Sequence, residues 1–289
     1  MTSLRLQTVL GDHPHVKPLK DGQTKSDLVD LEFIEFSPTN KAFKPMVREL
    51  KFDVCEMAIV TYLMAKAYGK PLVLLPAAML GRFQHASALY NAERGSLTPN
   101  DLAGKRVGIR SFTTTTGAWV RGILANDYDV DLSSITWVSF EDPHVAEYED
   151  TTERAPAGKT ILQMLLDGEI DAALGETSTD PRLKPLFGEP TGEAQRWHQR
   201  HGVVPVNHLV VVTESLAKSQ PDAVREVYRL LKQSKAMANL TGAPDFVPFG
   251  VEANRKALEM IIDYAAQQAL IPRRFSVDEL FDETTRTLD

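Results

Sequence analysis

Apolar and polar positions along the chain predict alternating strands and helices. Apolar and β-branched runs typical of strands occur at residues 4–10, 28–36, 52–55, 106–110 and 170–174. Between them, apolar residues recur at helical spacing, for example over residues 57–68 and in a stripe at 161–166 that ends at Gly168. Such alternation predicts α/β lobes with largely parallel sheets.

Two apolar runs contain polar residues where a purely structural strand would stay apolar. The run of residues 71–80 leads directly into Arg82 and His85, and the β-branched run of residues 202–212 carries Asn207 and His208 in its interior. Guanidinium and imidazole groups are rarely buried without partners. We therefore expect these two strands, far apart in sequence, to bring their polar groups to one cleft.

Two polar stretches divide the chain. Residues 92–104 and the Gly-, Pro- and charge-rich residues 186–202 are typical of crossings between lobes. We expect a bilobed clamp, with one discontinuous lobe from residues 1–90 and 201–289 and an inserted lobe from residues 91–200. Ligands of such folds bind between the lobes, near the carboxyl ends of strands.

Several residues near these predicted strand ends are candidates for ligand binding. Arg82 can hold a carboxylate with two parallel hydrogen bonds, although a surface arginine covering a strand end would look the same. The polar run after residue 110 can both cap a helix and offer hydroxyl and N–H groups to an anion. The expected substrate contacts beside Arg82 are Ser111, Thr113, Thr114, Thr115, Thr116, Asn207, His13 and Glu176.

Three residues are candidates for proton transfer: His208, His85 and Glu56. Imidazole titrates near neutrality without a large shift in pKa, which suits a general acid. His208 is the first choice, and strict strand alternation would turn Asn207 to the opposite face. Either histidine could instead be a core residue, and Glu56, at an expected strand-to-helix junction, could be a helix cap.

Composition narrows the class of protein. The 32 Lys and Arg residues against 39 Asp and Glu give a net charge of −7, which argues against a nucleic-acid partner. No stretch is apolar enough for a membrane span. The lone Cys55 excludes an intrachain disulfide and paired-cysteine zinc sites. Together with an N-terminal sequence that lacks the pattern of a secretory signal, it favours a cytoplasmic protein.

Cofactor motifs are absent from the sequence. It contains no glycine fingerprint for a nucleotide, no HExxH and no GxSxG. We expect no cofactor. A bound divalent metal is left as an alternative, with His208, His85 and Glu56 as its ligands. His13, His15 and His144 could form a second metal site if their loops converge, although the segment around His144 is interpreted mainly as a solvated loop.

Five segments resemble, in order and spacing, the 4,5-dihydroxyphthalate decarboxylase family. They read FDVCEMAIVTYL, GRFQHASALY, DLAGKRVGIRSFTTTTGAWVRGIL, MLLDGEIDAALGE and GVVPVNHLVVV, between Phe52 and Val212. The chain departs from the family's pattern at His13-Pro14-His15, where an Arg is expected, and in FEDPHVAEYED at residues 140–150. The resemblance implies a type II periplasmic-binding-protein-like fold, with two α/β lobes and a ligand cleft between them.

The resemblance also implies an activity. It indicates non-oxidative decarboxylation of a hydroxylated aromatic acid, similar to 4,5-dihydroxyphthalate, by proton delivery to the ring carbon and loss of CO2. The expected partner is therefore a small anionic aromatic substrate, and the oligomeric state is left open. The alternative is a solute-binding protein or sensor that binds an anionic small molecule without chemistry, because a fold alone does not separate binding from catalysis.

Overall fold

The first sheet brings together the strands that carry the polar residues. In the computed structural model, which describes residues 3–289, its strands lie in the order β2-β1-β3-β11-β4. Their bounds are β1 (Leu4–Val9), β2 (Val29–Phe33), β3 (Val54–Ala58), β4 (Leu72–Gly81) and β11 (Val206–Thr213). Strands β1, β2 and β3 are parallel, whereas β11 is antiparallel to both of its neighbours. Four of the five strands therefore run in the same direction, as expected for a largely parallel sheet, and β11, which enters from the other lobe, runs in the opposite direction.

The register of this sheet places the polar residues side by side. His208 on β11 pairs with Ala58 on β3 and with Leu80 on β4, and Val210 pairs with Glu56. The register between β11 and β4 shifts on both sides of His208. Such irregularities break the strict alternation of side chains, so neighbouring residues can face the same region.

The second sheet has the strand order β10-β5-β9-β6-β7-β8. The strands are β5 (Ala88–Asn91), β6 (Arg106–Ile109), β7 (Thr136–Ser139), β8 (Glu153–Arg154), β9 (Ala172–Leu174) and β10 (Leu183–Pro185). This sheet is also mixed, since β5 is antiparallel to both β9 and β10. The lobe boundaries at residues 91 and 200 stay a prediction, and the strands bracket them: β5 begins at Ala88 and β11 at Val206.

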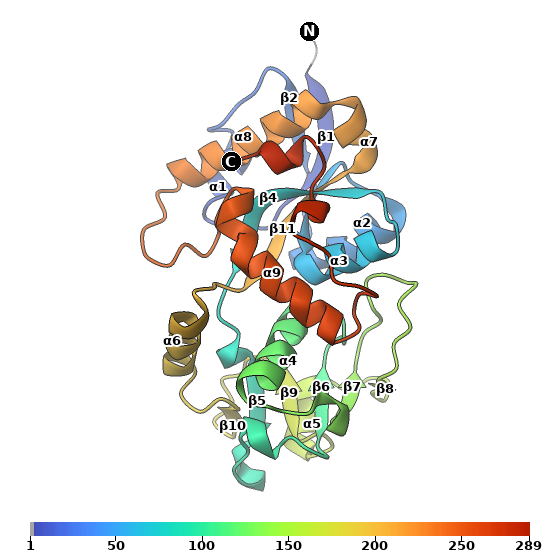
Figure 1. The fold of residues 1–289 in the computed structure, drawn as a ribbon, viewed down its shortest axis with the longest axis vertical. Coiled ribbons are helices and arrows are strands. Elements are labelled where there is room, and N and C mark those ends of the chain that lie inside the picture. Colours follow the sequence, from blue (N-terminus) through green and yellow to red (C-terminus); the bar gives the residue numbers. More distant parts are fainter. Residues whose placement is uncertain (1–2) are drawn as a thin grey trace.

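Helices cover both sheets (Figure 1). Beside the first sheet lie α1 (Lys17–Lys20), α2 (Phe43–Glu49), α3 (Ile59–Ala67), α7 (Glu214–Ser219) and α8 (Pro221–Met237). Beside the second sheet lie α4 (Thr115–Asp127), α5 (Ile161–Asp167) and α6 (Pro190–His201). Helix α8 shows why they pack this way, because Val224, Val227 and Leu231 recur at helical spacing and are buried.

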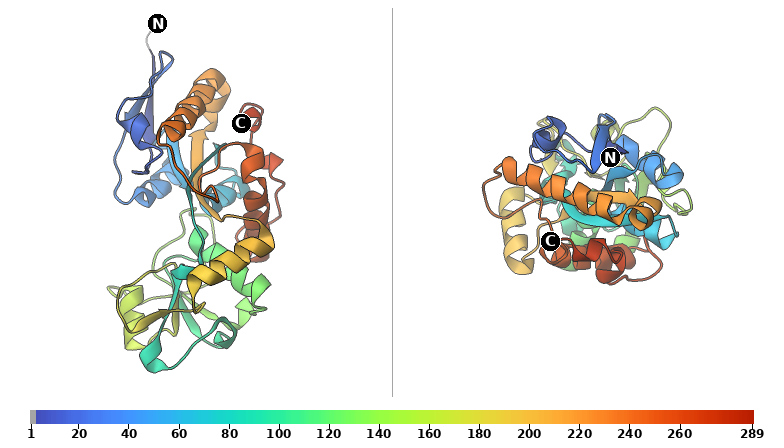
Figure 2. Two further views of the ribbon diagram at one scale, coloured as in Figure 1. Left: turned by 90° about the vertical axis from the view of Figure 1, so that its left-hand side faces the viewer. Right: turned by 90° about the horizontal axis from the view of Figure 1, so that it is seen from above.

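Helix α9 (Val251–Gln267) joins the two lobes along one side, as the turned view in Figure 2 shows. It packs against both α3 and α4. Gly122 on α4 allows this approach, because a Cβ at that position would lie 2.0 Å from the ring of Tyr264. The indole N–H of Trp119 on α4 also donates to the carbonyl of Val206, at 2.9 Å. One buried apolar cluster consequently continues from one lobe into the other.

None of the helices within residues 3–289 has both the length and the apolar character needed to cross a membrane.

Candidate functional site

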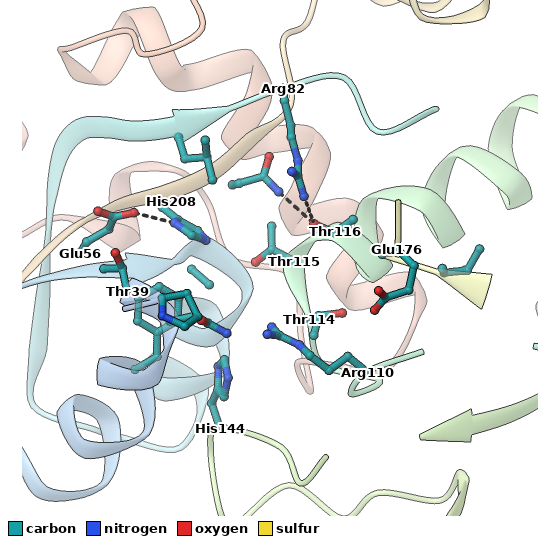
Figure 3. A pocket seen from close by; sticks show the side chains of 18 of the residues that line it. Thr39, Glu56, Arg82, Arg110, Thr114, Thr115, Thr116, His144, Glu176 and His208 are labelled. Atoms are coloured by element: carbon teal, nitrogen blue, oxygen red, sulfur yellow. Dashed lines mark hydrogen bonds and ion pairs between the residues drawn. The ribbon is translucent and has the colours of Figure 1, made fainter. Parts of the chain in front are cut away.

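A cavity of about 470 Å³ lies between the two sheets and is shown in Figure 3. Its size is within the usual range for small-molecule sites. Residues from both lobes line it: His13, Pro38, Thr39, Asn40, Phe43, Glu56, Ala58, Leu80, Arg82, Arg110, Thr114, Thr115, Thr116, His144, Leu174, Gly175, Glu176, Asn207 and His208. The sequence-predicted residues Arg82, Thr114, Thr115, Thr116, His13 and Glu176 are therefore brought together with His208, Asn207 and Glu56.

Glu56 is a buried carboxylate with three donors. It lies inside β3, with 1% of its surface exposed, so the reading of Glu56 as a helix cap is wrong. His208 Nδ1 donates to its Oε1 at 2.7 Å, and the amide of Gly11 donates to its Oε2 at 2.8 Å. His13 Nε2 lies 3.0 Å from Oε2. Burial alone would raise the pKa of Glu56, but the hydrogen bonds from His13 and His208 hold it well below its ordinary value.

Glycine at position 11 makes this arrangement possible. A Cβ at Gly11 would lie 2.7 Å from His13 Nε2, 2.9 Å from Thr39 Oγ1 and 3.0 Å from Glu56 Oε2. The backbone therefore approaches the carboxylate as closely as a residue without a side chain allows.

Within residues 3–289, one ring nitrogen of His208 is hydrogen-bonded to Glu56 and the other has no hydrogen-bond partner. Because Nδ1 donates to Glu56, Nε2 is the ring atom left for the cavity, and Figure 3 shows the imidazole between Glu56 and the open space. Asn207, its neighbour in sequence, lines the same cavity. The expectation that Asn207 points the other way is wrong, because the register shifts next to His208 interrupt the alternation.

Arg82 is held at the cavity by a polar network. Its Nη2 donates to Thr116 Oγ1 at 3.2 Å, and Asn207 Nδ2 donates to the same oxygen at 3.3 Å. The buried amide of Gln84 donates to both the Arg82 carbonyl and Asn207 Oδ1, each at 2.8 Å. Because Thr116 Oγ1 already accepts two hydrogen bonds, its own O–H is oriented away from them and can donate to a ligand anion.

The polar segment of residues 111–116 lines the cavity only in its second half, at Thr114, Thr115 and Thr116. Ser111 and Thr113 are buried, lie 3.1 Å apart between their hydroxyl oxygens, and do not line the cavity. Both were expected to contact substrate, and the structure instead buries their side chains within the segment that leads from β6 into α4. Thr115 reaches across to the other lobe, where its Oγ1 accepts from the amide of Val60 at 3.1 Å.

Two charged residues on the second lobe complete the lining. Arg110, which sequence reasoning missed, directly follows β6, and its ion pair with Glu141 is long, at 3.9 Å. The signal for it was the one used for Arg82, a cation at the end of an apolar strand. Burial raises the pKa of Glu176 above its ordinary value, although nearby Arg110 opposes this shift.

His144 also lines the cavity, and its interpretation as part of a solvated loop is wrong. The side chain is 8% exposed, and its Nδ1 lies 2.8 Å from the hydroxyl oxygen of Thr61. Arg48 on α2 explains the burial, because it donates to the carbonyls of Pro143 and His144 at 2.7 and 2.8 Å. The segment is thereby held against the first lobe.

His85 lies outside this cavity. After Arg82 the chain turns inward through a short 3₁₀ helix (His85–Ser87), and the imidazole packs against Phe187 and Trp197, with 1% of its surface exposed. It lines a separate space of about 130 Å³ beside α6. Burial lowers the pKa of His85 to about 4. The structure therefore does not bring His85 together with Glu56 and His208.

The donor groups do not form an evident metal site. Within residues 3–289, no group of three His, Cys, Asp or Glu side chains is arranged to hold a metal ion. A site made of His208, His85 and Glu56 lacks the necessary geometry because His85 is elsewhere. The set of His13, His15 and His144 is not such a group either, and His15 is buried with its ring stacked on that of His13.

The arrangement combines anion binding with proton transfer. Arg82, Arg110, Thr116 and the N-terminus of the 13-residue helix α4 offer positive charge and donors to an anionic ligand. On the first lobe, the imidazole of His208 is hydrogen-bonded to the buried Glu56 and is suited in type and position to proton transfer.

Solved structures of low sequence identity share this fold. The alkanesulfonate-binding protein SsuA from Xanthomonas axonopodis pv. citri, bound to MOPS, matches with a TM-score of 0.61 at 17% identity, over 98% of both chains. The desulfurization enzyme DSZB matches with a TM-score of 0.55 at 13% identity, over 99% of this chain and 98% of that one. The expected two-lobed, periplasmic-binding-protein-like fold is confirmed, and it occurs in both a binding protein and an enzyme.

Sequence relatives are more specific, although no family model matches the chain. A 4,5-dihydroxyphthalate decarboxylase of Pseudomonas putida is 29% identical over 221 residues, covering 69% of this chain and 83% of that protein. One of Comamonas testosteroni is 32% identical over 254 residues, which covers 82% of this chain and 77% of that protein. The aligned length and identity show that the chain belongs to the 4,5-dihydroxyphthalate decarboxylase family.

Proposed function

We propose that the protein catalyses the non-oxidative decarboxylation of a hydroxylated aromatic dicarboxylic acid similar to 4,5-dihydroxyphthalate. The observation that carries this proposal is the contact between His208 and the buried, ionised Glu56, facing a cleft that Arg82 and Arg110 also line. An anionic ring and a proton donor are the two components this reaction needs. The proposal includes a cytoplasmic location, supported by the single, buried Cys55.

His208 is the proposed acid. The imidazolium donates the proton on Nε2 to the ring carbon that bears the carboxylate, and the ring π electrons form the new C–H bond. The bond between that carbon and the carboxylate then breaks, and its electron pair returns to the ring as CO2 leaves. Aromaticity is restored without an oxidant, and His208 regains a proton from water.

Glu56 is the proposed partner of that acid. Its negative charge stabilises the imidazolium that must form before the proton is delivered, and its hydrogen bond to Nδ1 fixes the ring orientation. His13 and Gly11 keep Glu56 ionised by donating to its second oxygen. In this proposal, Glu56, His13 and Gly11 together favour the imidazolium form of His208 in a single ring orientation.

Arg82 and Arg110 are the proposed carboxylate contacts. The Gln84 and Asn207 network supports the position of Arg82, and the O–H of Thr116 adds a donor beside it. A carboxylate retained in the product would bind to such a fork of donors, because guanidinium matches carboxylate geometry. The carboxylate that leaves would then lie toward His208, away from the strongest cationic contacts.

The test uses purified protein with 4,5-dihydroxyphthalate, 3,4-dihydroxybenzoate, phthalate and benzoate, with and without a chelator. Release of CO2 from 4,5-dihydroxyphthalate, with one deuterium at the vacated ring position in D2O, is the expected result. Loss of activity with chelator and recovery with a divalent ion would instead indicate a metal-dependent mechanism. Saturable binding without CO2 release would favour the alternative of a solute-binding or sensor protein.

A further inference from the structure

His144 belongs to a segment of the second lobe that is fastened to the first. Beyond the two hydrogen bonds from Arg48 to the carbonyls of Pro143 and His144, Lys70 forms an ion pair with Glu147 at 2.5 Å. These contacts place the segment between β7 and β8 against helices α2 and α3. The imidazole therefore enters the cavity from a fixed backbone, and Figure 3 shows it on the wall below Arg110 and His208.

The ring of His144 has one nitrogen committed and one available. Nδ1 is hydrogen-bonded to the hydroxyl of Thr61. Nε2 has no hydrogen-bond partner within residues 3–289, and it is not among the fully buried unpaired atoms of that part of the chain. It is thus the polar atom through which this side chain can meet a ligand in the cavity.

The surroundings of His144 are cationic. Burial is the largest cause that lowers the pKa of His144, and the charges of Arg110, Lys44, Arg48 and His208 add to it, so that the pKa is about 3. The ring is therefore neutral at working pH. A neutral imidazole that accepts the Thr61 O–H at Nδ1 carries its proton on Nε2 and is a donor toward the cavity.

His144 and His208 are neighbours with opposite surroundings. The ring of Phe43 packs edge-on against both, with centroids 5.8 Å from His144 and 5.1 Å from His208. His208 is hydrogen-bonded to the carboxylate of Glu56, whereas the charges that act on His144 are the positive ones of Arg110, Lys44 and Arg48. His208 is therefore suited to deliver a proton, and His144 is suited to donate a hydrogen bond to an oxygen atom that gains negative charge.

We propose that His144 donates a hydrogen bond from Nε2 to a ring oxygen of the substrate, and that this contact selects hydroxylated rings in their phenolate form. The inference rests on the proposed function and adds the residue that recognises the hydroxyl group of the substrate. A phenolate conjugated with the ring carbon supplies the electron density that makes protonation by His208 easier. Arg110, Lys44 and Arg48 stabilise that phenolate without contacting the reacting carbon.

The experiment compares the affinities of two probes, 4,5-dihydroxyphthalate and phthalate, which differ only in the hydroxyl groups. Stopped-flow binding, recorded before turnover, on wild type and on His144→Gln should show that the variant loses about ten- to a hundredfold in affinity for 4,5-dihydroxyphthalate, with little change for phthalate. The absorbance of bound 4,5-dihydroxyphthalate should also show its phenol ionising at a higher pH in the variant. Thr61→Val should give the same pattern with smaller changes.

Arg48→Lys is the matched control, because it loses the two-point contact with the carbonyls of Pro143 and His144 but keeps both the positive charge and the imidazole. It should weaken both probes alike. A His144→Gln variant that also weakens both probes alike, or that leaves the ionisation of bound 4,5-dihydroxyphthalate unchanged, would show that His144 only fastens the segment. Wild-type protein that does not discriminate between the probes would overturn the inference as well. CO2 release, measured separately, decides the proposed function, so the two failures are distinguishable.

Discussion

Nδ1 of His208 lies 2.7 Å from Oε1 of Glu56, a carboxylate with 1% of its surface exposed. The residues come from antiparallel neighbouring strands, and 152 positions separate them in the sequence. A buried charge costs free energy unless it is paired and hydrogen-bonded, so this contact supports the fold as well as the proposed chemistry.

Replacing Glu56 should change both stability and its pH dependence. Glu56→Gln leaves His13 and His208 without their ionised partner and should lower the free energy of unfolding at pH 7 by about 3 to 5 kcal/mol. The folded-state pKa of Glu56 lies below the ordinary value of 4.5. The unfolded chain therefore binds the proton first, and the stabilisation is complete above pH 4.5 and is lost as the pH falls below it. Denaturant titrations of both proteins at pH 7, 4.5 and 3 measure this.

The difference between wild type and Glu56→Gln should accordingly shrink as the pH falls below 4.5. A difference that stays constant over this range would contradict an ionised Glu56. Gly11→Ala is a useful comparison, because it displaces the same carboxylate without removing its charge.

Removing the proposed acid should lower turnover more than affinity. His208→Gln keeps a polar side chain of similar reach but cannot deliver a proton, so kcat should fall by about 10² to 10⁴ while ligand affinity changes less. Steady-state kinetics with 4,5-dihydroxyphthalate and calorimetry with the same ligand separate the two effects. Full turnover in His208→Gln with chelator present would refute both the acid role and a metal held by His208.

The two arginines should contribute binding rather than proton transfer. Arg82→Lys keeps the positive charge but loses the planar fork, and should weaken a dicarboxylate by about 1.5 to 3 kcal/mol, or roughly ten- to a hundredfold. Arg110→Lys is the matched variant on the other lobe. If the arginines bind different carboxylates, benzoate should be less sensitive than phthalate to one of the two changes. Unchanged phthalate affinity in Arg82→Ala would remove Arg82 from the site.

His85 should affect acid stability rather than catalysis. Burial lowers its pKa from 6.5 to about 4, so the unfolded chain takes up a proton before the folded one does. This contribution makes stability decline as the pH falls from 6.5 to about 4. His85→Leu should reduce that decline and retain turnover, as measured by thermal unfolding across this range and by CO2 release. A variant with unchanged acid sensitivity and no activity would restore His85 as a catalytic candidate.

Part of the cleft lining could be predicted from the sequence, namely the polar residues that interrupt or directly follow an apolar strand. Arg82, Asn207 and His208 break apolar strands, and such breaks are visible without knowing the strand order. Arg110 gives the same kind of signal. The family resemblance added the fold, since two polar crossings alone do not specify how the lobes are built.

Other residues depend on partners that are distant in sequence. His85 follows an apolar strand as Arg82 does, but Phe187 and Trp197 bury it, and nothing near position 85 reveals them. His144 lies in a charged segment, and its burial depends on Arg48, 96 positions earlier. Hydrophobic periodicity reports the exposure of a helix or strand face, but it does not report such long-range contacts in loops.

The hydroxyl of Thr115 links the two lobes at the start of helix α3. Helix α3 has no side-chain cap of its own, since Ala58 occupies the N-cap position, and the amide of Val60 donates to Thr115 from the other lobe. Any separation of the lobes at this point leaves that amide without its acceptor, a loss of about 1 kcal/mol for a typical helix cap. The start of α3 in one lobe is thus completed by a side chain of the other, so the stability of this helix depends in part on where the second lobe lies.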